Sequence, residues 1–182
     1  MLRYIGKKYI TARREMGFLV PSKGYEYATI KGHKCAIIVG DDLSRERDFD
    51  QSVETVISIN ARKYGKGTMT YRYEMMRNLA FVESKNLVLV NQVGGSTDIV
   101  YDGTSGALNS RGELVLMMKN FEEDFQIFDT KASARPISIP STYNDRTRLV
   151  YEAARCGLRD FFRKNGYRKA SIGLSGGIDS AV

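Results

Sequence analysis

Three short apolar runs constrain the fold of this sequence more than any other feature. Residues 35–39, 53–59 and 87–90 are rich in aliphatic and β-branched side chains. Such runs favour strands that are buried on both faces of a sheet. Between the second and third runs, apolar residues recur at helical spacing, which predicts an amphipathic helix. The buried face of this helix is expected to comprise Met69, Tyr73, Met76, Ala80 and Glu83.

The order of the remaining elements indicates the type of sheet. Thr68 or Thr70 can cap the start of the predicted helix. Further along, residues 99–108 and 113–118 flank the polar turn 109–112, which ends in glycine and so suggests a hairpin. Strands that alternate with a helix and then run antiparallel predict an α/β fold with a mixed sheet.

A second helix is predicted in the last third of the chain. Asp145 can cap its start, and Asn165-Gly166 can end it. Residues 170–174 then alternate between apolar and polar side chains, which is typical of a strand. The apolar positions of the helix are Leu149, Val150, Ala153, Ala154, Leu158, Phe161 and Phe162.

Composition and proline placement suggest how the chain is divided. Two of the three prolines lie between residues 130 and 144, a stretch that we interpret as a linker. We therefore expect one domain over residues 1–130, a linker over 131–144, and the start of a second domain over 145–182.

No apolar run approaches the roughly 18 residues that a membrane span needs. Two cysteines are too few for a disulfide framework, so a cytoplasmic protein with no membrane partner is expected.

The net charge of +7 could indicate a polyanion as partner. No basic run is interleaved with aromatic residues on one periodic face, however, and nucleic acid is therefore not expected as a ligand. A site for a phosphate-bearing small molecule agrees better with this pattern.

The sequence Ser-Gly-Gly-Ile-Asp-Ser at residues 175–180 follows the last predicted strand and leads into a predicted helix. Paired glycines let backbone N–H groups approach an anion, the two serines offer hydroxyl groups, and the helix start is electropositive. Asp179 would repel a phosphate unless a cation such as Mg²⁺ lay between them. An ordinary strand-to-helix turn capped by Asp179 or Ser180 is the alternative, but all six residues in this context favour phosphate binding.

These six residues resemble the pyrophosphate-binding loop of the N-type ATP pyrophosphatases. Upstream segments resemble the C-terminal part of a nitrilase-type glutaminase. Those segments are Asn91 to Gly95, Val100 to Ser105, Asn109 to Glu113 and Phe121 to Asp124. With residues 157–166 added, the sequence is similar to glutamine-dependent NAD⁺ synthetases, cut short at both ends.

The resemblance implies a fold and an activity. It implies the C-terminal part of a nitrilase-like α/β sandwich, followed by the first helix, strand and loop of a Rossmann-like ATP pyrophosphatase domain. The parent enzyme would use ATP and Mg²⁺ to amidate deamido-NAD⁺, with glutamine or ammonia as nitrogen donor. Ser175, Gly176, Gly177 and Ser180 would hold the pyrophosphate, with Asp179 near Mg²⁺.

The glutaminase half departs from the family at its nucleophile. The family uses a Glu, Lys and Cys triad, and its cysteine should directly follow the strand at residues 36–39. Gly40 stands at that position, whereas Asp42 keeps its place. Cys35 lies at the other end of the strand, roughly 16 Å away at strand rise, and is interpreted as a small core residue. The triad glutamate would precede Met1.

Two lysines match family positions by their spacing. Lys7 matches the triad lysine, and a further loop glutamate would lie near Glu15. Because a lysine near an N-terminus is most often a solvated surface group, that interpretation of Lys7 is preferred. Lys66 resembles a substrate-side position, although a plain loop lysine fits nearly as well.

The sequence is therefore interpreted as a fragment, or a split gene product, of an NAD⁺ synthetase whose glutaminase half is inactive. Two alternatives remain. One is a different N-type ATP pyrophosphatase, although the segments between residues 91 and 124 argue against it. The other is a non-catalytic nitrilase-like domain that serves for subunit association. A homo-oligomer is expected in any case, because a partial sheet leaves strand edges and an apolar face uncovered.

Overall fold

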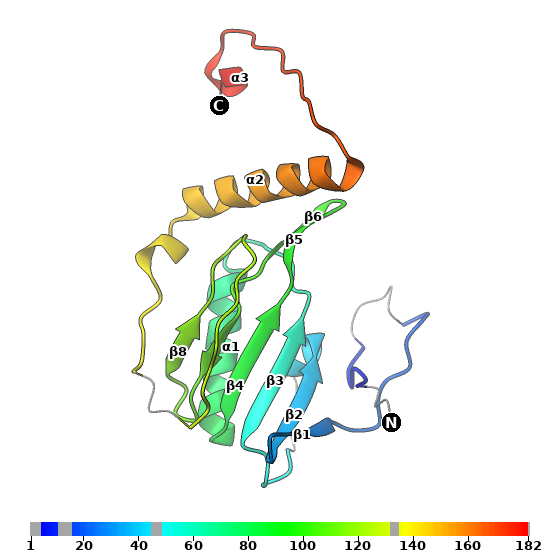
Figure 1. Ribbon diagram of the computed structural model, residues 1–182, viewed down its shortest axis with the longest axis vertical. Helices are drawn as coiled ribbons and strands as arrows, with labels where there is room; N and C mark the ends of the chain where they lie inside the picture. The colour runs from blue at the N-terminus through cyan, green and yellow to red at the C-terminus, as the bar shows by residue number, and fades with distance from the viewer. Residues whose placement is uncertain (1–4, 11–15, 45–48, 132–134, 182) are drawn as a thin grey trace.

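A mixed six-stranded sheet with one long helix on its face forms the body of the molecule (Figure 1). The computed structural model describes residues 5–10, 16–44, 49–131 and 135–181. Glu15 lies outside these described residues. The strands are β1 (Glu26–Ile30), β2 (His33–Val39), β3 (Thr55–Asn60), β4 (Asn86–Asn91), β7 (Gly106–Leu108) and β8 (Leu114–Met117). The sheet order is β1-β2-β3-β4-β7-β8, with β2, β3 and β4 parallel and the other pairs antiparallel. The expected mixed α/β sheet is confirmed.

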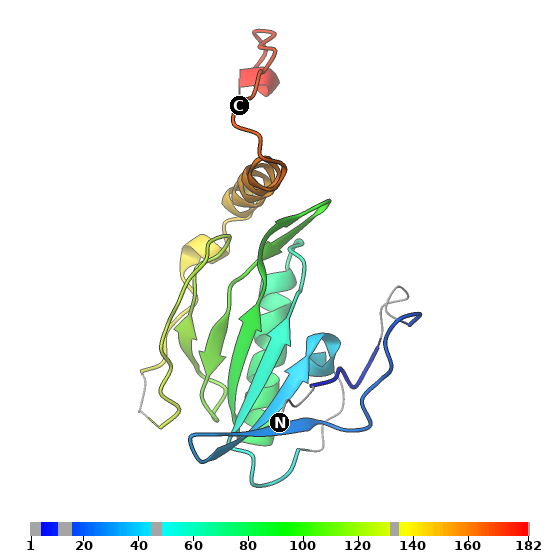
Figure 2. The same cartoon turned by 45° about the vertical axis from the view of Figure 1, so that its right-hand side comes forward.

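Helix α1 (Thr68–Glu83) covers one face of this sheet and supplies much of the core (Figure 2). Met69, Tyr73, Met76 and Ala80 are buried, as their helical spacing predicts. The prediction that Thr68 or Thr70 caps the helix is wrong. The N-cap residue is Gly67, and no side chain caps the helix. The Thr68 hydroxyl instead donates to the carbonyl of Gly65 at 2.8 Å, which closes the preceding turn.

The opposite face of the sheet is only partly covered. Val56 and Ser58 of β3 are fully buried under α1, whereas Ile59 points the other way and is 46% exposed. Its register partner on β4, Val90, is 48% exposed. Side chains alternate between the two faces of a strand, so the prediction of burial on both faces fails at the carboxyl ends of β3 and β4.

Residues 99–108 were expected to form one strand, and the structure divides them. β6 (Ile99–Asp102) pairs with β5 (Val93–Ser96) in a separate two-stranded sheet, and β7 joins the main sheet. The chain turns between them at Gly103 and Thr104, which both have positive φ angles. The expected hairpin around residues 109–112 is confirmed by the antiparallel pairing of β7 with β8.

Helix α2 (Arg146–Asn165) has the predicted ends. The Asp145 carboxylate accepts the backbone N–H of Arg148 at 3.0 Å, and Gly166 ends the helix with a φ angle of 70°. The predicted apolar positions pack only in part: Ala153 is buried and Leu149 packs against the small core around Phe121, whereas Val150, Leu158 and Phe161 are exposed. The buried residues of α2 are Ala153, Cys156 and Asp160.

The glycines of β5 explain why small residues form the packed face of α2. A Cβ atom at Gly95 would lie 3.0 Å from the Cα of Gly157, which is closer than real Cβ contacts ordinarily allow. Buried Asp160 accepts the N–H of Gly95 at 2.7 Å, and Lys164 donates to the Gly95 carbonyl. Close backbone approach therefore selects small residues where α2 meets β5, and Leu158 and Phe161 are left exposed.

The segment after α2 forms no strand. Residues 170–174 were predicted as one, but they are exposed and the described chain offers them no neighbouring strand. A strand satisfies its backbone groups only by pairing. Figures 1 and 2 show this segment leading away from the sheet to the short α3 (Ile178–Ala181). Residues 135–145, before α2, contain only the one-turn helix η2 (Ser141–Tyr143).

Candidate functional site

The loop at residues 175–180 closes on itself through its two serines. The hydroxyl groups of Ser175 and Ser180 lie 2.9 Å apart, and the Ser180 hydroxyl also lies within hydrogen-bond distance of the Ser175 N–H and the Gly177 carbonyl. Gly176 has a φ angle of 87°, a conformation open mainly to glycine. Residues 175–179 are exposed. Both hydroxyls and the glycine backbone thus face the same small, solvent-accessible turn.

Asp179 lies in the first turn of α3. In the described part of the chain, no group of three histidine, cysteine, aspartate or glutamate side chains could hold a metal ion. One carboxylate still fits Mg²⁺ bound together with phosphate, because that ion commonly takes most of its ligands from phosphate oxygens and water.

A second candidate site lies at the carboxyl ends of β2, β3 and β4, where ligands commonly bind in sheets with parallel strands. It is a cavity of about 820 Å³. Its lining includes Lys7, Val39, Gly40, Asn60, Ala61, Arg62, Lys63, Thr68, Tyr71, Arg72 and Gln92. No aspartate or glutamate of the described residues lines it. The cavity is therefore rich in cationic and amide groups.

Gly40 begins the short helix η1 (Gly40–Ser44) directly after β2 and lines this cavity. Its φ angle is 62°, and a Cβ atom there would lie 3.3 Å from the Cε of Lys7. Lys7 is half-buried beside Gly40, and whether it is only a surface lysine stays open. The fully buried Asp42 holds this arrangement, since its carboxylate accepts the N–H groups of Lys8 and Tyr9 at 2.9 and 2.8 Å.

Cys35 lies away from this cavity. It is buried in β2 and is absent from the cavity lining. Burial, together with the negative charge of Glu54, raises the pKa of the Cys35 thiol. Because a thiolate is the nucleophilic form, Cys35 is poorly suited to attack an amide. Its interpretation as a small core residue agrees with this placement.

Arg72, which lines this cavity, belongs to a buried polar network that the sequence analysis did not identify. Arg72 of α1 forms a two-pronged ion pair with Asp102, at 2.5 and 3.1 Å, and both side chains are 2% exposed. The amide of Asn91 donates to the same carboxylate at 3.0 Å. The one available signal was an arginine within an otherwise apolar helix face.

Oδ1 of Asn60 and Nε of Arg72, both in the cavity lining, lack hydrogen-bond partners among the described residues. Asn60 is the last residue of β3. Because ligands commonly bind at the carboxyl ends of parallel strands, this position could have indicated a site residue from the sequence alone. Buried polar atoms are nearly always paired, so the cavity lining retains hydrogen-bonding capacity.

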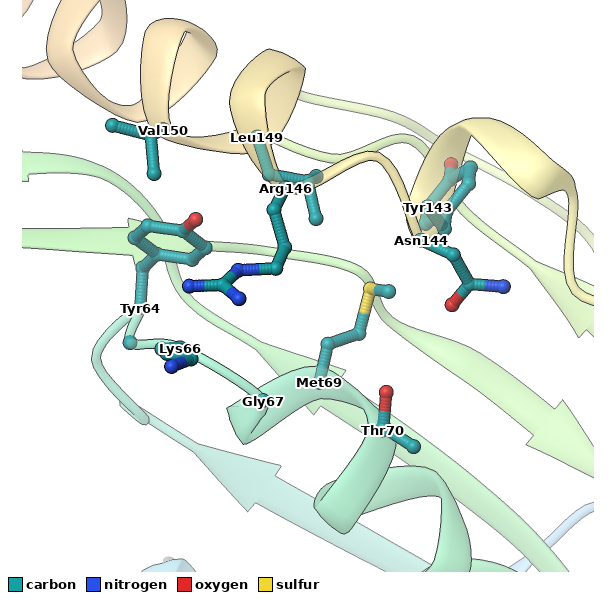
Figure 3. A pocket seen from close by; sticks show the side chains of 11 residues that line it. Tyr64, Lys66, Gly67, Met69, Thr70, Tyr143, Asn144, Arg146, Leu149 and Val150 are labelled. Carbon is teal, nitrogen blue, oxygen red and sulfur yellow. The ribbon is translucent and has the colours of Figure 1, made fainter.

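Lys66 lies in a different cavity, between the start of α1 and the start of α2 (Figure 3). The structure thus places the sequence-predicted positions in three separate regions. Lys7 and Gly40 share one cavity, Lys66 lines another, and residues 175–180 stand apart on the exposed C-terminal segment. No helix in the described part of the chain is both long and apolar enough to cross a membrane.

Comparisons with known proteins give related synthetases. No protein-family model matches the chain. The glutamine-dependent NAD(+) synthetase of Acinetobacter baylyi is 30% identical over 169 residues, which cover 88% of this chain and 31% of that protein. The Synechocystis enzyme of the same name is 30% identical over 175 residues, covering 86% of this chain and 31% of that protein.

A solved structure of the same kind of enzyme is also similar to this chain. The glutamine-dependent NAD+ synthetase of Acinetobacter baumannii, in complex with ADP, superposes with a TM-score of 0.76 at 26% identity, covering 97% of this chain and 35% of that one. The chain spans about a third of the length of these relatives. Structural neighbours also include nitrilase-superfamily amidases. The chain is therefore homologous to glutamine-dependent NAD(+) synthetases over most of its own length, and its sheet has the nitrilase-like fold.

Proposed function

We propose that this chain supplies the pyrophosphate-binding loop of an enzyme that amidates deamido-NAD⁺ to NAD⁺. The observation that carries the proposal is the loop at residues 175–180, whose paired serine hydroxyls and glycine backbone form one exposed turn. Homology to NAD(+) synthetases over 88% of the chain supports it, as does the ADP bound to the Acinetobacter baumannii relative.

The chemistry gives each loop residue a role. The nicotinate carboxylate attacks the α-phosphorus of ATP, pyrophosphate leaves, and ammonia then displaces AMP from the adenylate. Ser175, Ser180 and the N–H groups at Gly176 and Gly177 would donate hydrogen bonds to the departing pyrophosphate as its charge grows. Asp179 would help to hold Mg²⁺, which neutralises phosphate charge when bound.

We propose the same division of the chain that the sequence suggested. Residues 1–130 would form the nitrilase-like part, 131–144 the linker, and 145–182 the start of the ATP-binding domain. The contact between Asp160 and Gly95 supports a fixed placement of α2 on the nitrilase-like part. Such a contact would hold the beginning of the second domain at a defined position on the first.

We propose further that the nitrilase-like part hydrolyses no glutamine. Gly40 stands beside Lys7 where the resemblance requires a cysteine, and Cys35 is buried elsewhere with a raised pKa. Ammonia would then reach the adenylate either as the free molecule or from another glutaminase. The rate cost of a missing covalent nucleophile is commonly several orders of magnitude.

Exchange of labelled pyrophosphate into ATP tests the loop. The chain is extended through a complete ATP pyrophosphatase domain, and the exchange that depends on deamido-NAD⁺ is measured. The change Gly177→Val should abolish exchange, because a branched side chain keeps the phosphate from the loop backbone. Gly173→Val is the matched control, since Gly173 is an exposed glycine with nothing within 4 Å of its Cβ position. Exchange that persists in Gly177→Val would refute the assignment.

A second candidate function is a non-catalytic domain for subunit association. The observation that favours it is the partly bare sheet face, where the register partners Ile59 and Val90 are both about half exposed. Exposed apolar patches of this kind mark interaction surfaces. This role is compatible with the first one and predicts a homo-oligomer.

A further inference from the structure

The cavity around Lys66 joins elements that are far apart in the sequence. It has a volume of about 420 Å³, within the range typical of small-molecule sites. The loop at residues 64–67 and the start of α1 form one side, and residues 143–150 form the other. Figure 3 shows the Arg146 side chain reaching from the start of α2 towards Tyr64 and the loop that carries Lys66.

The charges of this cavity are unbalanced. Lys66 and Arg146 both line it, and none of its lining residues is acidic. Within residues 5–10, 16–44, 49–131 and 135–181, neither cation forms a salt bridge or a side-chain hydrogen bond. The acid next to Arg146 in the sequence, Asp145, is engaged as the N-cap of α2, where it accepts the Arg148 N–H. Two cations without a carboxylate between them create a site for an anion.

The start of α1 adds to the positive potential in this cavity. Gly67 caps the helix without any side-chain hydrogen bond, and the first turn contains no acidic residue. Met69 and Thr70 of that turn line the cavity. The first N–H groups of an α-helix have no partner within the helix, and the helix dipole is positive there. The 16-residue helix α1 therefore presents an electropositive end beside Lys66.

The walls of the cavity are aromatic and aliphatic. Tyr64, Met69, Leu149 and Val150 supply them. Tyr64 is held firmly, because its N–H donates to the carbonyl of Val100 at 2.7 Å and its ring packs edge-on against Phe121. A rigid aromatic ring next to two cations suits a ligand with a flat apolar part and an anionic group.

From this arrangement we propose that the cavity binds an organic phosphate of mononucleotide size. Its phosphate would lie between Lys66 and Arg146 at the start of α1, and its base would lie against Tyr64, Met69 and Leu149. A phosphate dianion matches two unpaired cations better than a carboxylate does. This site is separate from the loop at residues 175–180, which lies on the other side of α2 from the sheet (Figure 1). The inference therefore goes beyond the proposed function and does not depend on it.

A methionine-methyl NMR titration tests the proposal on the 182-residue chain, with AMP as probe. The Met69 signal is identified by its loss in Met69→Leu. AMP should move this signal saturably, while the signal of Met16, which is 60% exposed, stays in place. The double change Lys66→Gln and Arg146→Gln should weaken AMP binding about tenfold or more, because it removes two charge-assisted contacts.

Three controls decide the interpretation. Arg148→Gln lies two residues further along α2 and outside the cavity lining, and it should leave AMP binding unchanged. Gly177→Val should also leave it unchanged, which separates this site from the pyrophosphate loop. Adenosine, which lacks the phosphate, should bind much more weakly than AMP. An unmoved Met69 signal, or equal AMP binding in the double variant, would overturn the proposal, and so would adenosine binding as tight as that of AMP.

Discussion

The Nζ atom of Lys7 lies 3.4 Å from the point that a Cβ atom at Gly40 would occupy. The two residues are 33 positions apart, and Asp42 brings them together by accepting the N–H groups of Lys8 and Tyr9. Any side chain at position 40 would therefore leave the backbone directly beside an ammonium group. Glycine supplies no side chain at this point, and the ammonium group of Lys7 lies next to it.

We predict that the chain releases no ammonia from glutamine. Gly40→Cys should not restore hydrolysis to the 182-residue chain, because a side chain at position 40 would start from a backbone with a φ angle of 62° and would crowd Lys7. The same change should also destabilise the fold by about 1–2 kcal/mol, since Gly40 has a φ angle of 62°. Ammonia release is measured on the wild type and on Gly40→Cys, with thermal unfolding of Gly40→Ala as the control for backbone strain.

Cys35→Ala tests the alternative that Cys35 is the nucleophile. If Cys35 were the nucleophile, the wild type would release ammonia and Cys35→Ala would not. We expect no release from either protein, because burial raises the pKa of the Cys35 thiol and its side chain lies outside the cavity lining. Activity that disappears in Cys35→Ala would show that the placement of the missing nucleophile at Gly40 is wrong.

The buried Arg72–Asp102 pair leads to a prediction about stability. Arg72→Leu leaves the Asp102 carboxylate buried without its cation and should lower the free energy of unfolding by about 3–5 kcal/mol. The double change Arg72→Leu and Asp102→Leu should cost less, because no uncompensated charge remains. Arg77→Leu, at an exposed position of the same helix, should change stability by no more than about 0.5 kcal/mol.

Denaturant unfolding of these four proteins measures the differences. A loss below about 1 kcal/mol in Arg72→Leu would mean that water reaches Asp102 in place of the guanidinium. A double variant that is less stable than Arg72→Leu would show that the packing of the two side chains matters more than their charges.

Local signals in the sequence were enough to predict some elements. The ends of α2 follow from Asp145 and Gly166, because a carboxylate cap and a glycine with positive φ act within one turn. The strands β2, β3 and β4 follow from runs of aliphatic residues. The mixed character of the sheet follows from the helix between β3 and β4 and from the later hairpin of β7 and β8. These features depend on neighbours within a few residues in the chain.

Features that depend on distant contacts were missed. Residues 170–174 have the alternation of a strand, yet a strand also needs a partner, which the described chain does not place beside them. The packed face of α2 is set by the room that Gly95 leaves, about 60 residues earlier. Lys7 has no local sign of its position next to Gly40. In each case the sequence shows the residue type, and only the fold brings the partner.

The partly covered face of the sheet, opposite α1, predicts self-association. Ile59 and Val90 are cross-strand neighbours and lie about half exposed on this face. Burying such a pair against a second copy would remove apolar surface from water. Sedimentation at micromolar concentration should show an oligomer, and Ile59→Lys should shift it towards monomer. Ile172→Lys, at an exposed apolar residue after α2, is the matched control. A wild-type monomer would contradict this prediction.

The contact between Asp160 and Gly95 predicts how stability depends on pH. Burial by itself would raise the pKa of the Asp160 carboxyl, but the N–H of Gly95 together with Arg159 and Arg163 holds it below its usual value. The folded state therefore binds fewer protons than the unfolded state near the usual pKa of an aspartate. The stabilisation is complete above that pKa and is lost as the pH falls through the lower pKa of the folded state.

Asp160→Asn should lower the free energy of unfolding by about 1.5–3 kcal/mol at pH 7, because a charged acceptor is lost. The variant should also lose less stability than the wild type between about pH 5 and pH 2. Asp98→Asn, at an exposed aspartate of the same β5–β6 hairpin, should keep the pH dependence of the wild type. Equal acid sensitivity in the wild type and in Asp160→Asn, measured by denaturant unfolding at each pH, would show that Asp160 does not hold α2 to β5 through its charge.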